Sequence, residues 1–225
     1  MNFLPLYDQE SSRALDKAVS EVLGLSSIEM IRKAATIALA ILLKKWPRVQ
    51  SLAVFCGPGS NGADGLVLAL LAKKLGLLVS VYLATSEKSL TSITRICYEE
   101  CVKKEIIIRK FSEFDVQCDI VVDAVFGVGL NRDLEGEFSK TIKIINDSGR
   151  QVLSLDVPSG VDSSSGGVFG EAVKADVTLC FFGHKQGLFT GRGKTMAGEV
   201  LLEPLGKTET LGSLVRATSL AIGYE

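Results

Sequence analysis

The sequence is poor in the residues that build zinc sites and catalytic triads. It has a single histidine, His184, and its five cysteines form no CxxC pair. Zinc sites need cysteine and histidine ligands at short, regular spacings, so this pattern argues against one. A lone histidine with no visible partner also gives no sign of a Ser-His-Asp arrangement. An odd number of scattered cysteines is typical of a protein from a reducing compartment. The first residues also lack the basic-then-apolar pattern of a secretory signal. We therefore expect a cytoplasmic protein.

Long apolar runs and an excess of one charge are missing as well. The net charge is −1 at neutral pH, which argues against a broad basic surface for nucleic acid. No apolar run reaches the ~18 residues of a membrane-spanning helix, so we expect no membrane partner. The chain has 225 residues, of which 47% are hydrophobic and 23% charged. This composition is sufficient for one domain with a large core.

What the sequence does have is a glycine-rich turn between a strand pattern and a helical pattern. Residues 54–56 are apolar and lead into Gly57–Gly65, which reads Gly-Pro-Gly-Ser-Asn-Gly-Ala-Asp-Gly, and the apolar residues 66–72 follow. Glycine lets the backbone approach a ligand closely, and the free N–H groups at a helix start favour an anion. This setting is expected for a phosphate-bearing ligand in an α/β fold, although a turn that merely tightens a loop would also use glycine.

The acid that completes a conventional dinucleotide-binding fingerprint is missing. The spacing of Gly57, Gly59 and Gly62 fits that fingerprint. The second strand is expected at residues 78–83, and Ala-Thr-Ser follows it at 84–86 in place of an acid. A conventional NAD-dependent dehydrogenase therefore stays an alternative rather than the main interpretation.

Strand patterns and helix patterns alternate along the chain after two N-terminal helices. Helices are expected at residues 8–23, 26–46, 64–75, 90–103 and 137–148, and strands at 52–56, 78–83, 106–108, 119–123, 152–156, 175–181 and 199–202. Continuous apolar strands that alternate with helices predict a mostly parallel sheet with helices on both faces. The sequence becomes polar after Pro204, so we expect the domain at residues 1–205 and a tail or linker at residues 206–225.

Two of the expected strands end on acids, Asp123 and Asp156, and a glycine-containing loop follows each. Because the carboxyl ends of parallel strands lie on one edge of a sheet, we expect these acids near Asn61 and Asp64. Carboxylates can hold a hard cation or move protons, whereas an aspartate that only caps a turn or helix is the alternative for each. Lys185 follows another strand, where it would meet a phosphate or solvent.

These residues resemble the motifs of the NAD(P)H-hydrate epimerases, the YjeF N-terminal domain family. The turn Gly57–Gly65 resembles the GxGNNGGDG motif of that family, with Ser60 and Ala63 in place of an asparagine and a glycine. Four further segments match the family in order: residues 122–130, 155–162, 182–188 and 197–200. The resemblance covers about residues 8–205, and several motifs in the right order make it specific.

The resemblance implies a fold, a reaction and a set of site residues. The fold is a Rossmann-like three-layer α/β/α sandwich, often a homodimer. The reaction is an isomerisation that interconverts the R and S forms of hydrated NADH and NADPH (NADHX and NADPHX), and it repairs damaged cofactor together with an NAD(P)H-hydrate dehydratase. By position, the ligands of a potassium ion are Asn61, Asp123 and Ser159. The substrate contacts are Ser60, Asn61, Gly62, Ala63, Asp64, Gly127, Val128, Gly129, Leu130, Asn131, Arg132, Asp133 and Asp156.

The chemistry of this reaction assigns a role to Asp156. Inversion requires the hydroxyl beside the ring nitrogen to leave and return on the other face, or the ring to open and reclose. Either route needs a proton delivered and removed, so we expect Asp156 to be the catalytic acid/base. A second alternative is a non-catalytic, dimerising nucleotide-binding module of the same fold, which loss of the motif acids would indicate. The family is often fused to the dehydratase, for which 225 residues leave no room, so we expect a chain that works alone or a fragment.

Overall fold

The computed structural model describes residues 2–110, 117–205 and 214–223, and its centre is a seven-stranded sheet. The strands are β2 (Ser51–Cys56), β3 (Leu78–Leu83), β4 (Ile107–Lys110), β5 (Ile120–Ala124), β6 (Gln151–Leu155), β7 (Val177–Phe181) and β9 (Glu199–Glu203). They are arranged in the order β4-β3-β2-β5-β6-β7-β9, and every neighbouring pair is parallel. The predicted sheet is therefore confirmed, and all of its strands carry their carboxyl ends to one edge.

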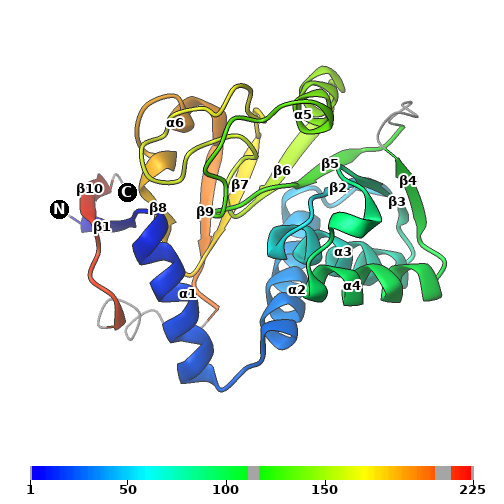
Figure 1. Ribbon diagram of the computed structural model, residues 1–225, viewed down its shortest axis with the longest axis horizontal. Coiled ribbons are helices and arrows are strands. Elements are labelled where there is room, and N and C mark those ends of the chain that lie inside the picture. The colour runs from blue at the N-terminus through cyan, green and yellow to red at the C-terminus, as the bar shows by residue number, and fades with distance from the viewer. Residues whose placement is uncertain (1, 111–116, 206–213, 224–225) are drawn as a thin grey trace.

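Helices cover both faces of this sheet (Figure 1). They include α2 (Ser27–Lys45), α3 (Ser60–Lys74), α4 (Ser92–Lys103) and α5 (Glu137–Asp147). Alternate residues of β2 pack into two separate cores. Val54 packs with the apolar residues of α2 and α3, whereas Phe55 packs with Ile142 and Ile145 of α5. The period-two alternation of a strand thus places α5 on one face and α2–α4 on the other, which gives the three-layer α/β/α arrangement.

The helices that precede the main sheet begin and end at recognisable caps. Helix α1 (Gln9–Leu23) begins after Asp8, whose side chain accepts a hydrogen bond from the backbone of Ser11, and ends at Gly24 in the left-handed region at φ 62°. Helix α2 begins after Ser26, and the Glu29 carboxylate accepts from the Ser26 backbone N–H at 2.8 Å, as in a capping box. Among the described residues, no helix is long and apolar enough to cross a membrane.

A second, three-stranded sheet was not predicted. It contains β1 (Asn2–Tyr7), β8 (His184–Lys185) and β10 (Ser219–Gly223) in the order β10-β1-β8. The two expected N-terminal helices, α1 and α2, are confirmed and precede the first strand of the main sheet, but β1 comes before both of them. Part of the segment expected to be a tail or linker also forms strand β10, which pairs antiparallel with β1. Residues 206–213 lie outside the described residues, and the domain boundary at residue 205 stays a prediction.

Candidate active site

A cavity of about 1170 Å³ opens beside the carboxyl ends of β2, β5 and β6. Its wall includes the turn after β2, residues 125–129 after β5, and Asp156 directly after β6. Helices α1 and α2 line another side, with Asp16 among the residues of α1, and residues 91–93 at the start of α4 and 181–182 at the end of β7 also contribute. This is the edge at which open parallel sheets bind their ligands, so the cavity is the candidate active site.

The turn after β2 brings the backbone unusually close to its neighbours. The Gly57 N–H donates to the Ala124 carbonyl at 3.1 Å, which fixes the turn against β5. A Cβ atom on Gly57 would lie 1.9 Å from the Val125 carbonyl oxygen, and one on Gly62 would lie 2.0 Å from the Gly57 oxygen. Only glycine fits both positions. Helix α3 then begins after Gly59, which has no side chain to cap the first N–H groups, so they remain able to bind an anion.

Asp123 sits behind the cavity wall as a fully buried carboxylate held by hydroxyl and backbone donors. The Ser159 hydroxyl donates to Oδ1 at 2.6 Å, and the Ser154 hydroxyl donates to Oδ2 at 2.8 Å. The Ser159 backbone N–H also donates to Oδ2 at 2.9 Å. Burial raises the pKa of Asp123, and the hydrogen bonds from Ser159, Ser154 and Val125 oppose that rise. No lysine, arginine or histidine among the described residues forms an ion pair with this carboxylate.

Asn61 faces the cavity with a side-chain amide that has no hydrogen-bond partner in the described part of the chain. The residue is 8% exposed, and both its Oδ1 and Nδ2 atoms are buried and unpaired. Its Cγ atom lies 3.5 Å from the position that a Cβ on Gly127 would take, and Asp156 Oδ2 lies 2.8 Å from the same point. A buried amide without partners costs folding free energy, and a ligand in the cavity that bound this amide would offset that cost.

Asp156 is held rigidly at the end of β6. Its backbone has φ 66°, a left-handed conformation that is uncommon outside glycine and concentrated at functional sites. Its Oδ1 atom forms an ion pair with Lys185 Nζ at 2.6 Å, and Oδ2 accepts from the Val128 N–H at 3.2 Å. The Lys185 side chain is only 2% exposed and also donates to the Phe181 carbonyl at 2.5 Å. Our expectation that Lys185 meets a phosphate or solvent is therefore wrong, because this lysine is buried against Asp156.

Two further carboxyl groups face the same cavity. Asp64 lies in the first turns of α3, and burial raises its pKa well above the ordinary value, with a further rise from Asp156 and Asp16. Asp16 projects from α1, and sequence reasoning missed it because it reads as one more polar residue of a surface helix. Its only signal was its position next to the buried Leu15.

Some of the predicted substrate contacts lie on the cavity wall, and the others lie in the core or on the exposed surface. The cavity wall contains Ser60, Asn61, Asp64, Gly127, Val128, Gly129 and Asp156. Gly62 and Ala63 are buried in the first turn of α3, and Leu130 is buried in the core under α5. Residues 131–133 are exposed and are not part of the cavity wall. The loop that carries them is fixed by Gln9, whose Nε2 donates to the Val128 carbonyl at 2.5 Å.

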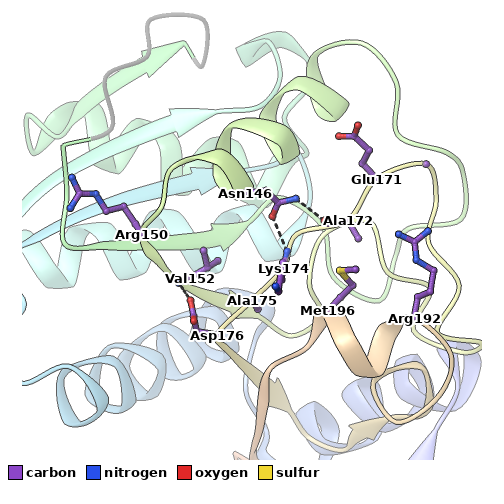
Figure 2. A pocket seen from close by; sticks show the side chains of 11 residues that line it. Asn146, Arg150, Val152, Glu171, Ala172, Lys174, Ala175, Asp176, Arg192 and Met196 are labelled. Atoms are coloured by element: carbon purple, nitrogen blue, oxygen red, sulfur yellow. Dashed lines mark hydrogen bonds between the residues drawn. The ribbon is translucent and has the colours of Figure 1, made fainter.

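A second cavity, of about 500 Å³, lies at the opposite edge of the sheet, near the start of β6 and β7 (Figure 2). Two of its polar side chains, Asn146 and Asp176, bind the backbone. Asn146 donates to the Ala172 carbonyl at 3.0 Å and accepts from the Lys174 N–H at 2.9 Å, and Asp176 accepts from the Val152 N–H at 2.7 Å. These groups are already paired, so the first cavity is the better candidate for chemistry.

Comparisons with known proteins agree on one family. A model of the family described as "YjeF-related protein N-terminus" matches residues 27–187. The bifunctional NAD(P)H-hydrate repair enzyme Nnr of Coxiella burnetii is 38% identical over 206 residues, which cover 91% of this chain and 42% of that protein. The NAD(P)H-hydrate epimerase of Limosilactobacillus fermentum is 31% identical over 190 residues, which cover 84% of this chain and 91% of that protein.

A solved structure supports the fold independently. The crystal structure of yeast ynu0 superposes with a TM-score of 0.74 at 19% identity, over 85% of this chain and 86% of that one. The lengths of the curated relatives differ from one another. This chain spans about two fifths of the length of two bifunctional relatives that it matches, whereas it spans most of the Limosilactobacillus protein.

Proposed function

We propose that this chain is an NAD(P)H-hydrate epimerase, and the premise is that it belongs to the YjeF-related protein N-terminus family. Its substrates are the hydrated forms of NADH and NADPH, and its reaction interconverts their R and S forms. The observation that carries the proposal is the strained, ion-paired Asp156 on the wall of a cavity at the carboxyl edge of the sheet. A rigid carboxylate beside a cavity is what the proton transfers of this reaction require.

The proton chemistry is assigned to Asp156. Lys185 neutralises this carboxylate and the Val128 N–H binds its second oxygen, so its two oxygens have fixed orientations towards the cavity. In that position it exchanges a proton with the hydroxyl beside the nitrogen of the hydrated ring. The free N–H groups at the start of α3 bind the phosphates, and the segments 60–64 and 127–133 are the proposed substrate contacts.

The donors around Asp123 fit a potassium ion. Asn61 offers a buried amide oxygen, Asp123 a buried carboxylate and Ser159 a hydroxyl. Within the described part of the chain, the Asn61 oxygen has no hydrogen-bond partner and the Asp123 carboxylate has no cationic partner. This set contains only oxygen donors and one formal negative charge, which matches a monovalent hard cation. The described residues hold no cluster of three or more His, Cys, Asp or Glu placed for a metal ion, as a divalent site would need. A bound potassium ion would supply positive charge that orders the turn and attracts the phosphates.

Further proposals concern the assembly, location and partners of the enzyme and the extent of its domain. We propose a homodimer, a cytoplasmic location and coupling to an NAD(P)H-hydrate dehydratase that consumes the S form. The names of the bifunctional relatives, which are repair enzymes with two activities in one chain, support the coupling. The boundary of the domain near residue 205 belongs to the same group of proposals.

The decisive experiment measures conversion of the R hydrate. The purified chain is mixed with R-NADHX and a dehydratase that accepts only the S form, and recovery of NADH is followed. The wild type should accelerate recovery, and Asp156→Asn, which keeps the shape but not the acid, should lose ~10²–10⁴ in rate. Asp147→Asn, an exposed aspartate of α5, is the matched control and should react at the wild-type rate. A wild-type chain without effect on this conversion would refute the proposed function.

Potassium is tested separately by thermal unfolding. The melting temperature should be higher in potassium chloride than in tetramethylammonium chloride, because a cation that binds only the folded state stabilises it. Asp123→Asn removes the carboxylate and should abolish most of that difference. Equal melting temperatures of the wild type in the two salts would remove the ion from the proposal without affecting the role of Asp156.

A further inference from the structure

The carboxyl group of Asp16 lies on the cavity wall and is incompletely hydrogen-bonded. Its Oδ1 atom is buried and has no hydrogen-bond partner among the described residues. Asp16 is carried by α1, which follows β1 and stands apart from the layers of the main sheet (Figure 1). It therefore approaches the cavity from a different wall than Asp156, which comes from the end of β6.

The charges around Asp16 do not balance. Three carboxyl groups, Asp16, Asp64 and Asp156, face this part of the cavity, and the buried ammonium of Lys185 is already paired with Asp156. Among the described residues, the other charged groups on the wall are Arg13, Lys17 and Glu21, which are exposed to solvent on α1. The Lys185 ammonium also donates a second hydrogen bond, to the Phe181 carbonyl. Ionising all three acids would leave uncompensated negative charge in a desolvated site, which is costly.

The site therefore keeps a proton outside the Asp156–Lys185 pair. Burial raises the pKa of Asp16 to about 7, Lys185 opposes that rise, and Asp156 adds to it. An acid that titrates near neutral pH is well matched to proton transfer, and two carboxyl groups in unequal environments are a common basis for separate acid and base roles.

We propose that Asp16 is a second catalytic residue of this site, which works as the acid while the ion-paired Asp156 works as the base. This inference rests on the proposed epimerase function and deepens it. The unpaired Oδ1 atom binds the hydroxyl of the hydrated ring on the side of α1. The carboxylate of Asp156 binds the incoming water on the side of β6.

The resulting steps balance in atoms and electrons. Asp16 gives its proton to the ring hydroxyl, the C–O bond breaks, water leaves, and the lone pair of the ring nitrogen forms a C=N⁺ bond. A water molecule then attacks the same carbon from the opposite face while Asp156 takes its proton, and the π pair of the C=N⁺ bond returns to nitrogen. One proton has moved from Asp16 to Asp156, and exchange with water in the open cavity restores the starting state. The reverse reaction uses the same two groups in exchanged roles.

The test compares pH profiles of R-hydrate conversion for three proteins. The wild-type rate should fall about tenfold per pH unit above about pH 7, where Asp16 loses its proton. Asp16→Asn should be slower by ~10²-fold or more and should lack this alkaline limb. Glu10→Gln removes the same charge from an exposed position of α1 and should retain both the rate and the limb.

The outcomes separate this inference from the proposed function. If the wild type converts the R hydrate but Asp16→Asn does so equally fast, Asp16 has no catalytic role and the epimerase proposal survives. If Asp16→Asn fails to fold, the wild-type profile alone decides, because a rate that stays constant from pH 6 to pH 9 would overturn the acid role. If the wild type itself does not convert the R hydrate, the proposed function has failed and this inference fails with it.

Discussion

The contact between Gly62 and Gly57 predicts a large difference between two Gly→Ala variants of the same turn. A Cβ on Gly62 would lie 2.0 Å from the Gly57 carbonyl oxygen, whereas ordinary van der Waals contact begins at 3.4 Å, an overlap of 3.4 − 2.0 = 1.4 Å. The neighbouring atoms belong to the backbone of a turn that is hydrogen-bonded to β5, so they cannot move aside cheaply. Overpacking of this kind costs about 3 kcal/mol or more.

Alanine has a compensating advantage at this position. Gly62 lies in the first turn of α3, where replacement of glycine by alanine contributes up to ~1 kcal/mol of helix propensity. The net expected loss is therefore about 2 kcal/mol or more. Gly59→Ala is the matched control, because a Cβ there would meet nothing within 4 Å and the residue has φ −95°, which alanine adopts easily. Its cost is limited to a poorer N-cap, within ~1 kcal/mol.

The measurement is the free energy of unfolding in urea for the wild type and both variants at one pH. Gly62→Ala should unfold at clearly lower urea concentration than Gly59→Ala, and the slope of the transition should be unchanged. If the two variants are equally stable, a Cβ at position 62 does not clash with the Gly57 carbonyl oxygen, and glycine is not required at that position.

Three further outcomes follow from the buried polar groups. Lys185→Gln leaves the carboxylate of Asp156 without its cation and should lower the free energy of unfolding by ~3–5 kcal/mol. The double variant with Asp156→Asn should recover part of this loss in thermal unfolding. No recovery would contradict the ion pair. Burial raises the pKa of Asp16 to about 7, so the protonated carboxyl stabilises the fold at low pH and this contribution is lost as the pH rises through about 7. The stability of the wild type relative to Asp16→Asn should therefore fall by at most ~3 kcal/mol between pH 5 and pH 8, whereas a constant difference would exclude this titration. All five cysteines are buried, and burial raises the pKa of Cys101 to about 12. The folded protein should therefore not react with a thiol reagent at pH 8 until it is denatured. Rapid reaction of the folded protein would show that these thiols are accessible.

The sequence predicts the main sheet well because its signals are local. Each strand is a short apolar run between turn residues, and Asp123 and Asp156 follow from the positions at which two of these runs end. β1 and β10 escape prediction because β1 contains Pro5 and because their pairing joins opposite ends of the chain.

The pairings within the site were harder to predict for a similar reason. Lys185 follows a strand and resembles a solvated lysine, and only the fold shows that its partner lies 29 residues earlier in the chain, at Asp156. Asp16 is one polar residue in a helix with many, and only the position of α1 brings it to the cavity. Pairings that depend on tertiary structure leave no periodic signal in the sequence.

The small sheet has a consequence for how the protein matures. β8 carries Lys185, its neighbour β1 leads directly into the helix that carries Asp16, and β1 is completed only by β10. The pairing of Leu6 with Ser219 closes a loop of 219 − 6 = 213 residues. Such a contact forms late, because most of the loop-closure entropy must be overcome first. During synthesis, the glycine turn and the main sheet can assemble while the chain is still growing, whereas the strand that supports the lysine and the helical acid waits until residues near 219 have emerged from the ribosome.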